Sequence, residues 1–289
     1  RERIIFQEHA PDGVPKLTQK LRPEAWELLR VEDRDRNVDA VLAAITPAAI
    51  AARLAQLAAE GKLPALDPAA KHDPQKSTAS IVRSFTWASH FLSVPAPAIY
   101  VHEEAQVAIA TVIAEEPSVM AGSAALRGRT LTELAFLVGR HLSYHIEAHR
   151  LLLYYSSLEE LSACFVAAVK IASPEVPLPP SIEASATDIK KRIEPRLTAP
   201  QKAELVAAVR AFEADKKRAN LAAWVGSVER FATRAGMLIC GDLDAAVAVL
   251  RGDAGGVVDV EAKVRDLYGF YVSDANHALR EEVGIAVEP

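Results

Sequence analysis

The chain contains little cysteine and no excess of basic residues, and each shortage excludes a class of protein. Two cysteines among 289 residues are too few for a disulfide framework or a cysteine-rich metal site. Cys164 and Cys240 stand in apolar runs and are predicted to be buried thiols. A formal net charge of −5 provides no basic field for nucleic acid, so no DNA or RNA partner is expected.

Long apolar runs are also missing from the sequence. No run approaches the roughly 18–20 residues that a membrane span needs, and the first residues do not resemble a signal peptide. Half of the residues are nevertheless hydrophobic, which is ample for a large core. We therefore expect a soluble, cytoplasmic protein without a membrane span, although a targeting segment could precede Arg1.

Helical patterns dominate the chain and predict two domains. Residues 1–76 read as a helical lead-in that opens with a short strand at residues 3–7. A proline separates two expected helices, at residues 38–45 and 48–59. Residues 77–289 are the second domain, and a proline-bearing linker precedes them.

Beyond the short strand at residues 3–7, strand chemistry occurs in one region only. Three short segments rich in β-branched residues, at residues 98–101, 108–113 and 118–121, are separated by charged or proline-bearing turns. They predict a small antiparallel sheet. The fold class is therefore α+β and mainly α-helical.

The most informative stretch is a buried-looking helix with three histidines. A capping box at Thr130 predicts that the helix begins there, and its pattern continues to about Tyr155. Residues four positions apart on a helix differ by about 40° in their angular position around the helix axis. His141, His145 and His149 therefore point roughly one way. Two of these imidazoles could bind one metal ion.

The residue after the first histidine decides the chemistry of such a helix. A zinc peptidase with a His-x-x-x-His pair needs a glutamate there to deprotonate the metal-bound water, and this chain has Leu142. Glu147 cannot replace it, because it lies roughly 120° around the helix from His141. Since general acid–base catalysis supplies about 10²–10⁴ in rate, hydrolysis by that route is expected to be disabled.

The order of these segments resembles that of the HtpX-like family of zinc metallopeptidases, which includes the CaaX prenyl proteases. The similarity covers roughly residues 77–250 and rests on three strands, the entry to the histidine helix and the histidine pair: Ala98–Val101, Ala108–Ile113, Ser118–Gly122, Thr132–Val138 and His141-Leu-Ser-Tyr-His145. The resemblance implies a zincin-like, gluzincin-type core in which a small sheet packs on a central helix that bears the histidines.

The resemblance also implies a set of zinc ligands. They are His141, His145 and Glu229, whose context Glu229-Arg-Phe-Ala-Thr-Arg is similar to the family's third-ligand motif. His149 becomes a further ligand only if the helix bends. Thr233 stands where the family has an aspartate that orients a bound histidine. The alternative is that the histidines are hydrogen-bonded core residues and Glu229 belongs to an ordinary surface ion pair.

Three functions remain open. The first is a catalytically inactive metallopeptidase-like domain, a pseudoenzyme that serves protein binding or scaffolding. Its cleft would hold a protein or peptide segment, which predicts an exposed edge strand near residues 108–112 and an apolar groove above His141. The second is a zinc-dependent hydrolase with a non-standard base, for which Glu103 and Glu104 are candidates. The third is a structural module of a larger helical-repeat protein. Restoring the motif by Leu142→Glu would test the first two.

Overall fold

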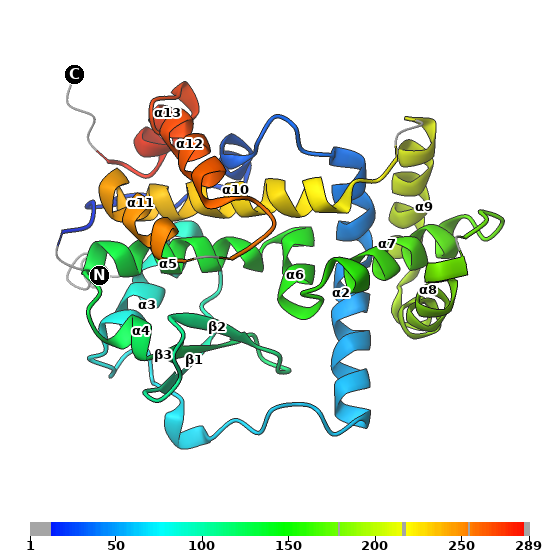
Figure 1. Ribbon diagram of the computed structural model, residues 1–289, viewed down its shortest axis with the longest axis horizontal. Helices are drawn as coiled ribbons and strands as arrows, with labels where there is room; N and C mark the ends of the chain where they lie inside the picture. The colour runs from blue at the N-terminus through cyan, green and yellow to red at the C-terminus, as the bar shows by residue number, and fades with distance from the viewer. Residues whose placement is uncertain (1–12, 179, 216–217, 254, 286–289) are drawn as a thin grey trace. The chain divides into compact units, whose positions relative to one another are not determined.

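A computed structural model describes residues 13–178, 180–215, 218–253 and 255–285 (Figure 1). The strand expected at residues 3–7 lies outside these ranges. In the described part of the chain, helices predominate and three strands form a single sheet, so the mainly helical α+β class is confirmed.

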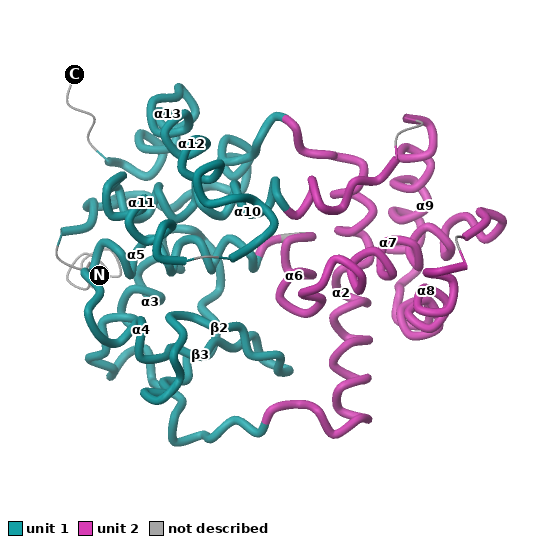
Figure 2. Tube along the Cα trace, viewed as in Figure 1, with its two compact units in different colours: residues 1–32, 65–145, 226–289 teal, residues 33–64, 146–225 magenta. Residues whose placement is uncertain are grey.

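The chain divides into two compact units, which Figure 2 distinguishes by colour. Unit 1 consists of residues 1–32, 65–145 and 226–289, and unit 2 of residues 33–64 and 146–225. Each unit therefore combines segments that are far apart in the sequence. This division differs from the boundary at residue 76 that the sequence predicts, because compactness depends on contacts between distant segments and not only on linker composition.

Unit 1 contains the sheet, His141 and His145, and most of the short helices. Its elements are η1 (Pro23–Leu29), η2 (Pro68–Ala70), α3 (Ser80–Leu92), β1 (Ala98–His102), β2 (Ile109–Val112), β3 (Ser118–Gly122), α4 (Ser123–Leu126), α5 (Leu131–Leu142), η3 (Ser143–His145), α10 (Leu221–Cys240), α11 (Leu243–Gly252), α12 (Val260–Tyr271) and α13 (Asp274–Glu282). The boundary with unit 2 falls within α10, at Gly226.

Unit 2 is built around one long helix. Its elements are α2 (Arg36–Ala59), η4 (Glu147–Arg150), α6 (Leu151–Tyr154), α7 (Leu158–Ala172), α8 (Pro180–Ile193), η5 (Glu194–Arg196) and α9 (Ala199–Ala214). The helices α7, α8 and α9 all pack against α2. The expected helices at residues 38–45 and 48–59 are thus one continuous helix with Pro47 inside it. Burial of the apolar side of α2 outweighs the hydrogen bond that the proline removes.

Among the described helices, only α2 passes a length-and-composition test for a membrane span, with a mean hydropathy of 1.6 over its most apolar window. The sequence, in contrast, predicts no run of that length and hydropathy. However, 61% of that window is buried inside the protein. A buried core helix passes the same test, so the finding gives no clear indication of a membrane segment.

The helices α5 and α10 of unit 1 lie alongside each other (Figure 1), and glycines make their close approach feasible. A Cβ atom at Gly139 of α5 would lie 3.0 Å from the Cβ of Ile239, and one at Gly236 of α10 would lie 2.7 Å from the carbonyl oxygen of Phe136. The apolar stretch Leu134–Val138 is buried here, as its sequence predicts. This close approach fixes α5 as the central helix of unit 1.

The sheet has the predicted strands but not the predicted pairing. The strand order is β1-β3-β2, with β2 antiparallel to β3 and β1 parallel to it. The expectation of an antiparallel sheet is therefore wrong, and the sheet is mixed. The hairpin of β2 and β3 follows from its short turn, whereas β1 pairs with the far side of β3 instead of with β2. Consequently β2 lies at an edge of the sheet.

The expected single helix from Thr130 to Tyr155 is also wrong beyond its first three turns. Its beginning is confirmed, because Thr130 and Glu133 form the capping box. However, α5 ends at Leu142, the next three residues form the 3-10 turn η3, and Ile146 is extended. The Ser143 hydroxyl donates to the Arg140 carbonyl, which offers the last turn an alternative to helical bonding. The three histidines therefore lie on three successive elements.

Other core predictions are confirmed. The indole rings of Trp26, Trp87 and Trp224 are all buried. Cys164 and Cys240 are free, buried thiols, and burial raises the pKa of each to about 12. Neither thiol is therefore a reactive thiolate at neutral pH.

Candidate functional site

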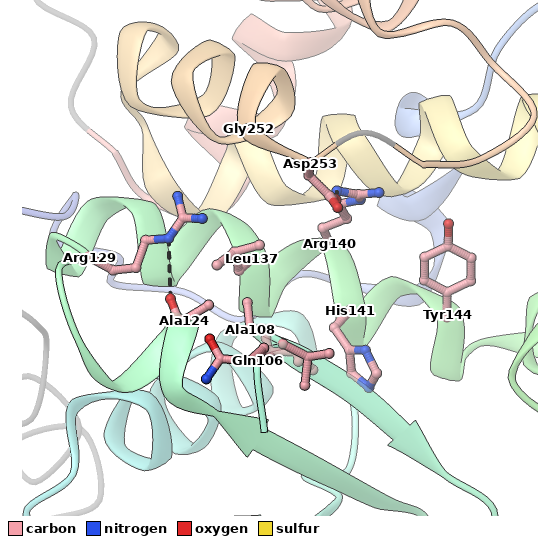
Figure 3. Close-up of a pocket in the computed structure, with 12 residues that line it drawn as sticks. Gln106, Ala108, Ala124, Arg129, Leu137, Arg140, His141, Tyr144, Gly252 and Asp253 are labelled. Carbon is pink, nitrogen blue, oxygen red and sulfur yellow. Dashed lines mark hydrogen bonds and ion pairs between the residues drawn. The ribbon is translucent and has the colours of Figure 1, made fainter. Parts of the chain in front are cut away.

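A cavity of about 420 Å³ lies beside the first histidine, and all of its walls belong to unit 1 (Figure 3). Residues 106–109 at the start of β2 form one wall. Leu137, Arg140 and His141 of α5, with Tyr144 just beyond it, form a second wall. Ala124, Arg129, Gly252 and Asp253 complete the lining. The cavity thus combines a sheet edge with the histidine-bearing helix.

The backbone of β2 directs hydrogen-bonding groups toward the open edge of the sheet. The Ala108 carbonyl accepts from the Gly122 amide, and this pair continues the register in which Ile109 faces Ala121. Because antiparallel pairs alternate, the backbone groups of Ile109 and Thr111 point away from β3. They could pair with an added strand. Gly122 is needed at this point, because a Cβ there would collide with the carbonyl oxygens of residues 105 and 107.

His141 and His145 are brought together as the four-residue spacing predicts. Their Nε2 atoms are 3.3 Å apart, and His141 also meets the Phe85 ring edge-on, with 5.9 Å between the ring centroids. Burial, with smaller contributions from His145 and Arg140, lowers the pKa of His141 to about 3. The His141 imidazole is therefore neutral at physiological pH. Two nitrogens bound to one tetrahedral zinc ion are also about 3.3–3.4 Å apart, so this spacing suits a shared proton or a metal.

Glu229, the third expected ligand, forms an ion pair and backbone hydrogen bonds instead. Its carboxylate is buried, and Oε2 lies 2.9 Å from Nζ of Lys263, whose side chain is 2% exposed. Its two oxygens accept from the backbone amides of Val257 and Val258, at 2.7 and 3.1 Å. The Lys263 ammonium also donates to the Gly255 carbonyl at 2.8 Å. Glu229 thus anchors the loop between α11 and α12.

Gly256 allows that loop to close around the carboxylate. Its φ of +102° is a conformation that L side chains rarely adopt, and a Cβ there would lie 2.5 Å from both oxygens of Glu229. The sequence places Gly255-Gly256 in a turn but contains no signal that this turn encloses Glu229. The sequence likewise gives no signal that Lys263 is the partner of Glu229, since a single lysine on an amphipathic helix is normally exposed to solvent.

The three zinc ligands that the resemblance implies are not grouped in the described structure. Within the described residues, no three His, Cys, Asp or Glu side chains are grouped so that they could hold a metal ion. His149 belongs to unit 2, where it is buried edge-on against Trp224. Thr233 is fully buried and donates to the Glu229 carbonyl within α10. The structure therefore brings together His141 and His145 but not the remaining candidates.

None of the general-base positions considered in the sequence, where its side chain is described, lines the cavity. Leu142 is fully buried and does not line it. Glu103 and Glu104 are exposed and do not line it either, and Glu103 pairs with Arg127 at 3.1 Å. The side chain of Glu147 lies outside the described structure. Asp253 is the one carboxylate among the described lining residues, and its Oδ2 lies 2.5 Å from Nη1 of Arg140.

Comparisons with models of known families, with curated proteins and with solved structures give no match to this chain. The resemblance described above therefore rests on the residues quoted for it.

Sequence reasoning missed three polar residues of the cavity. Arg129, Arg140 and Tyr144 are drawn in Figure 3, where Nε of Arg129 points to the Ala124 carbonyl at 3.3 Å. Burial raises the pKa of Tyr144 to about 12, so its phenol keeps its proton at neutral pH. Within the described residues its hydroxyl makes no hydrogen bond, so it is able to donate to a ligand. Arg140 and Tyr144 are adjacent to the histidines in the sequence, and this adjacency is the one signal that could have indicated these two residues.

Proposed function

We propose that this chain is a catalytically degenerate, metallopeptidase-like protein that binds an extended segment of another protein without cleaving it. The observation that supports this most strongly is that the start of β2, an edge strand, and His141 of α5 line the same cavity. A peptide that adds a strand to β2 would present alternate side chains to this cavity.

The chemistry of the cavity favours binding over hydrolysis. Val107, which is 38% exposed, lies with Ile109 and Leu137 among the lining residues and offers apolar surface to a bound side chain. Tyr144 offers a neutral hydroxyl donor. Among the described lining residues no carboxylate is unpaired, because Asp253 is held by Arg140. Without a free carboxylate, the glutamate-type activation of an attacking water that the resemblance implies is lost.

A proline at position 111 should weaken peptide binding while leaving the sheet intact. The Thr111 amide points to the open edge, so Thr111→Pro removes a donor for the added strand and none of the bonds to β3. We expect the affinity for a labelled strand-forming peptide to fall at least about fivefold, because one backbone hydrogen bond contributes about 1 kcal/mol. Fluorescence anisotropy measures the change.

The control for this experiment is Thr111→Ala, which retains the amide and removes the same side chain. It should bind as the parent does, and circular dichroism should show that both variants are folded. Equal affinity of Thr111→Pro and the parent would exclude strand addition at β2.

Zinc is the cofactor that the resemblance implies, and we expect the dialysed protein to contain far less than one zinc per chain. Two imidazoles alone are fewer protein ligands than the three or four of stable zinc sites, and Glu229 is held by Lys263. Elemental analysis of the parent, of His141→Ala and of a surface control, His277→Ala, tests this. About one zinc per chain, lost only in His141→Ala, would instead support the zinc-hydrolase alternative.

A further inference from the structure

The cavity beside β2 has an incompletely paired cation in its wall. Of its charged lining residues, Arg140 and Asp253 neutralise each other at 2.5 Å. Arg129 is the third charged lining residue, and the acid within ion-pair distance of it in the described structure is Glu133, which does not line the cavity.

The ion pair between Arg129 and its nearest acid is long. Nη1 of Arg129 lies 3.4 Å from Oε1 of Glu133, which is long for a charge-assisted hydrogen bond, where about 2.7–2.9 Å is usual. The other oxygen of Glu133 is committed to the helix cap, since it accepts from the Thr130 amide at 2.8 Å. Nη2 of Arg129 donates no hydrogen bond within the described residues.

The guanidinium is nevertheless held in place. Its Nε donates to the Ala124 carbonyl at 3.3 Å, as the dashed line in Figure 3 shows, and its side chain is only 23% exposed. An oriented, partly buried guanidinium with an unused nitrogen suits a carboxylate, because its planar fork matches carboxylate oxygens.

We propose that the segment that binds along β2 carries an acidic side chain, which enters the cavity and is held by Arg129. This proposal rests on the proposed function, since an added strand is what delivers the side chain. It makes Arg129 a specificity-determining residue, while the backbone of β2 supplies affinity that does not depend on sequence.

The test uses three strand-forming peptides that differ only in one residue, which is Glu, Gln or Lys. With the parent chain, we expect the Glu peptide to bind at least about tenfold more tightly than the Gln peptide, since hydrogen bonds to charged groups contribute about 1.5–3 kcal/mol. The Lys peptide should bind most weakly. In Arg129→Gln the preference for Glu over Gln should disappear, while the affinity for the Gln peptide stays the same.

Arg127→Gln is the matched control, because it removes the same charge two residues away. The Arg127 side chain is 73% exposed and does not line the cavity, so this variant should keep the preference for Glu. Arg129→Lys keeps the charge without the planar fork and should show an intermediate preference. Circular dichroism verifies the folding of each variant.

The outcomes separate the two proposals. Equal binding of the three peptides to the parent would overturn the acidic specificity and leave strand addition in place. If Arg127→Gln and Arg129→Gln lose the preference for the Glu peptide equally, this preference comes from the overall electrostatic field of the protein, and the role of Arg129 is overturned. Absence of binding by every peptide would overturn both proposals.

Discussion

Lys263→Met is expected to lower the free energy of unfolding by about 3–5 kcal/mol, one of the two largest effects that the structure predicts. The Lys263 and Glu229 side chains are 2% and 9% exposed, and their charges lie 2.9 Å apart. Methionine fills a similar volume but leaves the carboxylate buried without its counter-charge. Urea unfolding followed by circular dichroism measures the loss. Hydrogen exchange at the amides of Val257 and Val258 should accelerate, since both donate to Glu229.

Lys76→Met is the control for this loss. Lys76 is 86% exposed and pairs with Asp73 at 3.5 Å, so its replacement should change stability by less than about 0.5 kcal/mol. If Lys263→Met does not fold, the double variant Lys263→Met/Glu229→Gln remains informative, because it buries no charge and should retain more stability. Equal losses in Lys263→Met and Lys76→Met would show that the buried pair does not stabilise the loop.

Leu142→Glu is expected to destabilise the protein by on the order of 5 kcal/mol rather than to create a peptidase. The sequence alone suggests the opposite, since this change restores the family's motif. In the structure, however, Leu142 is fully buried and does not line the cavity. A carboxylate there would lose its hydration without gaining a metal-bound water to act on. Thermal unfolding measures the stability, and a casein assay with added zinc measures activity.

Leu142→Met is the matched control, because it keeps the apolar character and the volume. It should cost less than about 1.5 kcal/mol. A Leu142→Glu variant that is as stable as the parent would contradict the burial argument. If that variant also cleaved casein with zinc while the parent did not, the proposed loss of catalysis would be attributable to this one residue.

Several local features could be predicted from the sequence because their causes are local. The capping box of Thr130 and Glu133 depends on two side chains three residues apart, and it is formed. The strands at β1, β2 and β3 follow from short β-branched runs between turns. The proximity of His141 and His145 follows from their spacing, because a 3-10 turn still returns the second imidazole to the first.

The pairing of these elements could not be predicted in the same way. Whether β1 joins β2 or β3 depends on how the sheet packs, since either partner satisfies the strand's hydrogen bonds. The end of α5 at Leu142 reflects competition between helical bonds and the alternative offered by Ser143, which local propensity does not resolve. By local rules alone Pro47 likewise predicts a helix start, although burial keeps α2 continuous.

Apolar periodicity and residue spacing are properties of the chain, so they already specify the mainly helical class, the buried thiols and tryptophans, and the histidine pair. Folding is what brings Lys263, a residue 34 positions later, to Glu229, which is therefore not grouped with the histidines. Buried charges must find a counter-charge wherever the fold provides one, and that partner need not be near in sequence.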